Sequence, residues 1–121
     1  MASDSYRIPD ATDAIQLHGR LTDLKALDAR LYDVEASSAY TDRVLVATAN
    51  STTHLGALTE RVLESMKSLR LKVYNNSAGG GAKWRIVDGG EIIVHLFLAG
   101  ERARLDFDSL FQEARGASKS S

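Results

Sequence analysis

The chain has 121 residues, of which 44% are hydrophobic and 26% are charged, as in a soluble globular protein of one domain. It contains no cysteine, which excludes disulfides, thiolate catalysis and cysteine-bound zinc. The formal net charge of -1 argues against a protein held on nucleic acid mainly by phosphate neutralisation. No apolar run reaches the roughly 18 residues of a membrane span. The first residues also lack the apolar block of a signal peptide, so we expect a cytoplasmic protein with no membrane partner.

The first third of the sequence predicts a leader, a helix and a strand. Residues 1–11 are expected to form a flexible leader. Apolar residues at three- and four-residue spacing then predict an amphipathic helix over residues 12–27, with Asp10 or Thr12 as its N-cap. A short strand is expected at residues 31–34.

The middle of the sequence predicts strand, helix and strand. Four consecutive apolar residues at 44–47 are typical of a strand that is covered on both faces. Asn50 and Ser51 are good N-cap residues, and the helical period after them predicts a helix over residues 52–68. Alternation at residues 71–74 then predicts a third strand.

The last third predicts a loop, a hairpin, a short helix and a tail. Three glycines make residues 75–83 a loop, and the apolar runs 84–88 and 91–98 flank a Gly-Gly pair, a strong hairpin signal. A closing helix is expected at residues 107–114, followed by a disordered tail at 116–121. The order of elements predicts an α/β fold, a single domain over residues 12–115 with a mixed sheet of about five strands flanked by helices.

The three histidines do not form a metal site. His18 is expected on the solvated side of the first helix, His54 in the first turn of the second, and His95 in a strand among apolar residues. No two of them share a metal-ligand spacing. Asp106 and Asp108 have the spacing of a metal-binding pair, but N-capping by Asp106 explains them better. We therefore expect no metal and no cofactor.

The segment Thr48–His54 runs from a strand into a helix N-terminus, which is a geometry that can hold a phosphate. It lacks the glycines and the lysine of a P-loop and the glycines of a dinucleotide fingerprint. An ordinary capped helix start is the better interpretation. The enzyme alternative is a nucleotide-binding or nucleotidyltransferase-like protein that uses this segment.

The predicted hairpin has two unlike faces. A two-residue turn would place Asp88 opposite Glu91, Ile86 opposite Ile93, and Trp84 opposite His95. The face that carries these side chains mixes aromatic, aliphatic and polar groups, which is typical of an interface patch; a half-buried sheet edge is the competing interpretation. The other face is mostly aliphatic and suits the core; it carries Arg85, Val87, Ile92, Val94, Leu96 and Leu98.

The stretch from Trp84 to Phe97 (WRIVDGGEIIVHLF) resembles the signature of the Iojap-like ribosomal silencing factor family. That family has a Trp, an Asp four residues later, a Gly, and then Val-His with a Phe after one apolar residue. Further positions agree in order along the chain, namely Lys25, Ala26, Asp28, Thr41, Asp42, Asn50, Ser51, His54, Arg102 and Leu110. The sequence departs from the family pattern at Arg43, Ala49, Asn75, Leu105 and Phe111.

The resemblance implies a non-enzymatic translation factor with a nucleotidyltransferase-like fold. Family members bind the large ribosomal subunit through its ribosomal protein number fourteen, block joining of the small subunit and silence translation when nutrients run short. The near-neutral charge suits docking on a ribosomal protein, so no sequence-specific nucleic acid binding is expected. The resemblance also implies that the protein can associate with itself as a homodimer. An adaptor unrelated to ribosomes would use the same hairpin face.

The resemblance and the hairpin pattern together nominate the residues of the site. The helix-start motif consists of Asn50, Ser51 and His54, and no residue is expected to be catalytic. The residues expected to bind the ribosomal protein are Trp84, Ile86, Asp88, Ile93, His95, Asp42 and Arg102.

Overall fold

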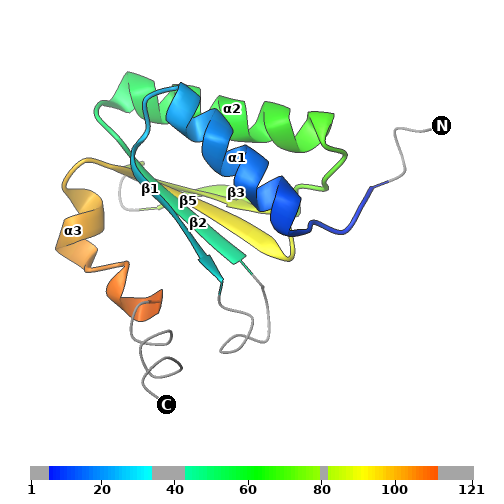
Figure 1. The fold of residues 1–121 in the computed structure, drawn as a ribbon. Helices are drawn as coiled ribbons and strands as arrows, with labels where there is room; N and C mark the ends of the chain where they lie inside the picture. Colours follow the sequence, from blue (N-terminus) through cyan, green and yellow to red (C-terminus); the bar gives the residue numbers. More distant parts are fainter. Residues whose placement is uncertain (1–5, 34–42, 80–81, 112–121) are drawn as a thin grey trace, which may run out of the picture.

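A computed structural model describes residues 6–33, 43–79 and 82–111 (Figure 1). Along the chain it contains α1 (Ala11–Asp23), β1 (Leu27–Asp33), β2 (Arg43–Ala49), α2 (Thr52–Ser68), β3 (Asn75–Gly79), β4 (Trp84–Asp88), β5 (Ile92–Leu98) and α3 (Glu101–Leu105). The five strands form one sheet in the order β1-β2-β5-β4-β3. The central pair β2 and β5 is parallel and the other pairs are antiparallel, which confirms the predicted mixed sheet.

Helices α1 and α2 lie together over one face of the sheet (Figure 1). The main core fills the space between them and the sheet, and it includes Leu17 and Leu21 of α1 and Leu58 and Met66 of α2, all fully buried. Full burial of an aliphatic side chain of this size contributes roughly 1.5–3 kcal/mol each. The helix layer therefore covers one face of the sheet, and the opposite face is not covered by α1 or α2. None of the helices among the described residues is long and apolar enough to span a bilayer.

The starts of both long helices follow from their capping residues. Asp10 caps α1, since its carboxylate accepts from the Asp13 N–H at 3.1 Å while the Asp13 carboxylate accepts from the Asp10 N–H at 3.0 Å. Ser51 caps α2, whose bounds are those predicted. The prediction for the end of α1 was wrong, because that helix stops at Asp23 and the chain turns through Lys25, which has a positive φ of 65°, into β1.

The structure describes residues 6–11 of the segment expected as a leader. There Arg7 forms a β-bridge with Leu71, its guanidinium donates to the Leu69 carbonyl at 2.7 Å, and it pairs with the Asp13 carboxylate at 2.8 Å. This side chain binds a free carbonyl at the C-terminal end of α2. It thereby joins the start of α1 to the end of α2.

The third strand was predicted in the wrong place. Residues 71–74 contribute only the bridge at Leu71, whereas the expected loop contains β3 at Asn75–Gly79, paired antiparallel with β4. Asn and Gly have low intrinsic strand preference, so the pairing with β4 overrides the local signal. These small polar residues suit β3, which is an edge strand and is mostly exposed.

The register of the β4–β5 hairpin differs from the prediction by two residues. Trp84 lies opposite Phe97, Ile86 opposite His95, and Asp88 opposite Ile93. The turn lies one residue later than predicted, at Gly90-Glu91, because the Gly89 N–H donates to the Ile92 carbonyl at 2.8 Å and pairs these two residues across the hairpin. A shift of two residues keeps every side chain on its predicted face, since strand side chains alternate with period two.

The closing helix was also misplaced. The helical segment α3 covers Glu101–Leu105 instead of residues 107–114, and Asp106, expected as an N-cap, is its left-handed C-cap at φ 52°. Residues 109–111 are helical again after this break. The predicted tail at residues 116–121 lies outside the described residues.

Candidate interaction surface

The sheet face opposite α1 and α2 is rich in aromatic side chains, and we call it the aromatic face. The strand register brings the same-side residues of four strands together on it. Its members are Tyr32 of β1, Val44 and Val46 of β2, Trp84, Ile86 and Asp88 of β4, and Ile93, His95 and Phe97 of β5. The predicted aliphatic face of the hairpin packs in the main core under α1 and α2, as expected, through Val87, Ile92, Val94, Leu96 and Leu98.

The chain after α3 covers one half of the aromatic face. The Phe107 ring lies 4.7 Å from the His95 ring, 4.9 Å from the Phe97 ring and 5.7 Å from the Trp84 ring, measured between centroids. Phe111 extends the cluster, because it stacks on Tyr32 at 5.4 Å. Under this cover Val44, Val46 and Phe97 are buried, which gives the domain a second, smaller core.

The rest of the aromatic face is only partly covered, and Phe107 reaches it only at His95 and Trp84. Five predicted site residues, Trp84, Ile86, Asp88, Ile93 and His95, lie there, and each is half-buried. They come from two adjacent antiparallel strands, so their side chains form one continuous patch. We call these five residues the open patch. The structure therefore brings together five of the seven residues expected to bind a partner.

A hydrogen bond between side chains organises the open patch. The Trp84 indole Nε1–H donates to Nδ1 of His95 at 3.1 Å, and the indole stacks on Phe97 at 5.0 Å. Nδ1 can accept only when the imidazole is neutral and carries its proton on Nε2. Burial lowers the pKa of His95 to about 4, and the negative charge of Asp88 opposes this effect only in part. At neutral pH His95 is therefore an uncharged acceptor that orients the indole.

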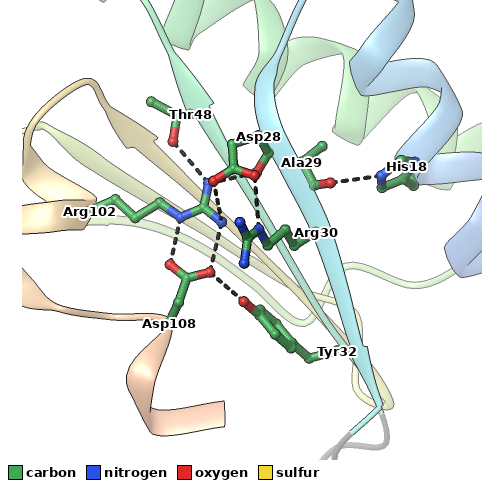
Figure 2. A network of polar contacts seen from close by, with 8 residues as sticks. All are labelled: His18, Asp28, Ala29, Arg30, Tyr32, Thr48, Arg102 and Asp108. Atoms are coloured by element: carbon green, nitrogen blue, oxygen red, sulfur yellow. Dashed lines mark hydrogen bonds and ion pairs between the residues drawn. The ribbon is translucent and has the colours of Figure 1, made fainter. Parts of the chain in front are cut away.

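Arg102 lies beside the aromatic face at the centre of a polar network (Figure 2). Its guanidinium makes a two-pronged pair with Asp108, at 2.6 Å and 2.7 Å, and also donates to the Asp28 carbonyl at 2.7 Å and to Thr48 Oγ1 at 3.0 Å. The Tyr32 hydroxyl donates to the second oxygen of Asp108 at 2.6 Å. The side chain of Arg102 is only 9% exposed, so its donors point into the protein.

The partners of Arg102 are functional candidates that sequence reasoning missed or assigned otherwise. The hydrogen bond from Arg102 lowers the pKa of Asp108, a residue expected only beside a helix cap. Asp28 agrees with the family pattern, and its carboxylate also pairs with Arg30 at 2.8 Å. A cleft of about 360 Å³ opens beside the network between β1, β2 and α3. Among the described residues no group of three or more His, Asp or Glu is placed to hold a metal ion.

The helix-start motif uses its polar groups internally. Ser51 Oγ accepts from the His54 N–H at 3.0 Å, and the Asn50 N–H donates to His54 Nδ1 at 3.0 Å. The other ring nitrogen of His54 donates to the Leu24 carbonyl at 2.7 Å. His54 thus ties the start of α2 to the turn after α1, which is the capping interpretation of this segment.

The remaining residues singled out by the sequence are His18, Asp42 and the departures from the family pattern. His18 is not a free solvated residue, because its Nε2 donates to the Ala29 carbonyl of β1 at 2.9 Å. Asp42 lies outside the described residues, so its place relative to the open patch stays a prediction. Among the departures from the family pattern, Phe111 packs on Tyr32, whereas Leu105 is exposed.

Comparison with known proteins identifies the family. The model of a family described as "Ribosomal silencing factor during starvation" matches residues 9–121. The chain is 33% identical over 95 residues to the ribosomal silencing factor RsfS of Treponema pallidum, covering 77% of this chain and 84% of that protein. It is 29% identical over 104 residues to the chloroplastic protein Iojap of Arabidopsis thaliana, covering 84% of this chain and 42% of the longer plant protein.

A solved structure supports the fold independently. A crystal structure of a protein from Chromobacterium violaceum matches with a TM-score of 0.81 at 23% sequence identity, covering 87% of this chain and 88% of that one. At this identity the likeness speaks for the fold alone, and it agrees with the five-stranded mixed sheet. The family match over nearly the whole chain and the 33% identical relative show that this protein belongs to the Iojap-like ribosomal silencing factor family.

Proposed function

We propose that this protein binds the large ribosomal subunit through its ribosomal protein number fourteen and sterically blocks association with the small subunit. In this way it represses translation in the cytoplasm when nutrients are limiting. The proposal rests on membership of the family and on relatives that carry the name ribosomal silencing factor. It assigns the protein a binding role and no catalytic one.

The observation that carries the proposal is the open patch. It holds a tryptophan oriented by a histidine, two half-buried isoleucines and an aspartate at its edge. Interfaces concentrate their binding energy in a few aromatic and polar anchors of this kind, surrounded by contacts that exclude water. We propose that Trp84 is the main anchor, with Ile86 and Ile93 beside it. Asp42 is proposed as a further contact with the partner.

Several features favour a ribosomal protein over ribosomal RNA as the docking partner. The chain has a formal net charge of -1, whereas phosphate binding draws on clustered positive charge. The open patch itself carries aromatic and aliphatic groups with one acidic residue. Self-association through the same patch would compete with the ribosome, so a homodimer is proposed as an alternative state of the free protein.

Sedimentation with isolated large subunits tests the binding surface. Ile86→Ala removes a half-buried aliphatic side chain from the open patch, and Leu63→Ala removes one from α2, packed against the main core. Both changes shorten a half-buried aliphatic side chain to alanine, but they lie on opposite sides of the sheet. We expect Ile86→Ala to weaken binding about tenfold, which corresponds to about 1.4 kcal/mol, while Leu63→Ala binds as the parent does.

The result that would contradict the surface is equally specific. If folded Leu63→Ala lost large-subunit binding while Ile86→Ala kept it, the partner would contact the helix layer instead. Binding that required a nucleotide would favour the enzyme alternative at the start of α2. A parent protein that failed to sediment with large subunits would overturn the proposed function itself.

A further inference from the structure

Arg102 presents a contradiction between its expected role and its position. A side chain that contacts a partner should offer its donors to solvent, yet Arg102 is 8% exposed and four different groups accept from it or pair with it. The neighbouring Arg104 on the same short helix is the opposite case, because its side chain is 65% exposed and, among the described residues, its guanidinium pairs with Glu101 alone. Arg102 therefore acts inside the protein.

The contacts of Arg102 converge on one segment. The two-pronged pair holds Asp108, and the Tyr32 hydroxyl holds the same carboxylate from β1 (Figure 2). Asp108 directly follows Phe107, whose ring packs against His95 and Trp84. Fixing the carboxylate of Asp108 thus also fixes the ring of its neighbour in the chain.

Helix α3 by itself does little to fix the position of this segment. Helix α3 is only five residues long, and the backbone has a positive φ at both of its ends, 92° at Gly100 and 52° at Asp106. So short a helix contributes little stability of its own. A planar guanidinium that binds a carboxylate with two parallel hydrogen bonds supplies the missing orientation, because the pair forms in one geometry only.

We propose that Arg102 and Asp108 are positioning residues that hold Phe107 against the rings of Trp84 and His95 and so set the shape of the open patch. The inference rests on the proposed function, since it names what prepares the binding surface for its partner. It replaces direct contact by Arg102, expected from the sequence, with an indirect role. Nothing in the role requires Arg102 to touch the ribosome.

The tryptophan gives the proposal a readout that is independent of the ribosome. Trp84 is the only tryptophan of the chain, so its fluorescence reports the packing of the open patch alone. We expect Arg102→Met to shift Trp84 emission to longer wavelength, to raise its quenching by acrylamide about twofold and to weaken large-subunit binding at least tenfold. Arg104→Met removes the same charge from the same helix and should leave all three quantities at parental values.

Two further variants separate positioning from a general loss of stability. Arg102→Lys keeps the charge but cannot form the two-pronged pair, so it should recover the melting temperature more fully than it recovers Trp84 emission. Tyr32→Phe removes only the hydroxyl bond to Asp108, and should shift emission in the same direction as Arg102→Met, by a smaller amount. This mild variant decides the question if Arg102→Met does not fold.

The outcomes that overturn the proposal are distinct from a failure of the proposed function. The first such outcome is a folded Arg102→Met protein with unchanged Trp84 emission and quenching. If Arg102→Met is unfolded, the same result in Tyr32→Phe decides. Either result would show that the Arg102–Asp108 pair does not position the open patch. Lost binding with unchanged emission would return Arg102 to direct contact with the partner. If the parent itself does not sediment with large subunits, the proposed function fails, while the fluorescence still tests the positioning role.

Discussion

Acid should destabilise this domain through His95. The imidazole accepts the indole hydrogen bond of Trp84 in its neutral form, among aromatic rings that exclude water. Protonation in the folded state would remove that acceptor and bury a positive charge. The unfolded chain pays neither cost, so protons favour unfolding as the pH falls.

The size of the effect follows from the two pKa values. The pKa of His95 is about 4 in the folded protein and about 6.5 in an unfolded chain. Because the folded pKa is depressed, the stabilisation by neutral His95 is complete above pH 6.5 and is lost progressively as the pH falls toward 4. At pH 5 the loss should be about 2 kcal/mol, and below pH 4 it should approach about 3 kcal/mol.

Urea unfolding at pH 8 and pH 5 measures this loss, with His95→Asn as the reference protein. Asn keeps an oxygen that can accept from the indole but does not titrate. The other two histidines are present in both proteins, so their contributions cancel in the difference. The hydrogen bond from Arg102 lowers the pKa of Asp108, so the stabilisation by that carboxylate is lost only below pH 5, outside the range compared. Equal pH dependence of the two proteins would refute the reasoning.

Two further predictions concern local backbone features. Ser51→Ala should lower the free energy of unfolding by about 1 kcal/mol in urea titrations, because α2 loses its N-cap; an unchanged midpoint would mean that Asn50 or water replaces the cap. Gly90→Ala should lower it by about 1–2 kcal/mol, since Gly90 has φ 89° and an added Cβ would lie 3.0 Å from the Tyr74 ring; a Tm equal to that of the parent would contradict this.

The sequence predicted best where local signals and packing agree. Helix α2 was predicted with its observed bounds because its cap and its apolar period coincide. The two faces of the hairpin were also correct, although the register was not, because strand alternation depends only on period two. These features are encoded within a few residues of one another.

The remainder depends on contacts between residues distant in sequence. β3 forms because β4 offers a pairing edge, and its own residues favour a loop. Arg102 is separated by 74 residues from Asp28 and by 54 from Thr48, so no spacing rule could place its guanidinium among them. The role of Asp108 was missed for the same reason, because its partner Tyr32 lies in β1, 76 residues away in the sequence. The open patch was thus predictable, but its support was not.

Joining of isolated ribosomal subunits tests the central claim most directly. Added protein should lower the yield of joined ribosomes in proportion to its occupancy of large subunits, without any nucleotide, and Ile86→Ala should inhibit only at the higher concentrations at which it binds. Inhibition that needed ATP or GTP would contradict silencing by steric exclusion. So would inhibition by Ile86→Ala as strong as that by the parent at concentrations at which the variant leaves large subunits unoccupied, because the open patch would then not be required.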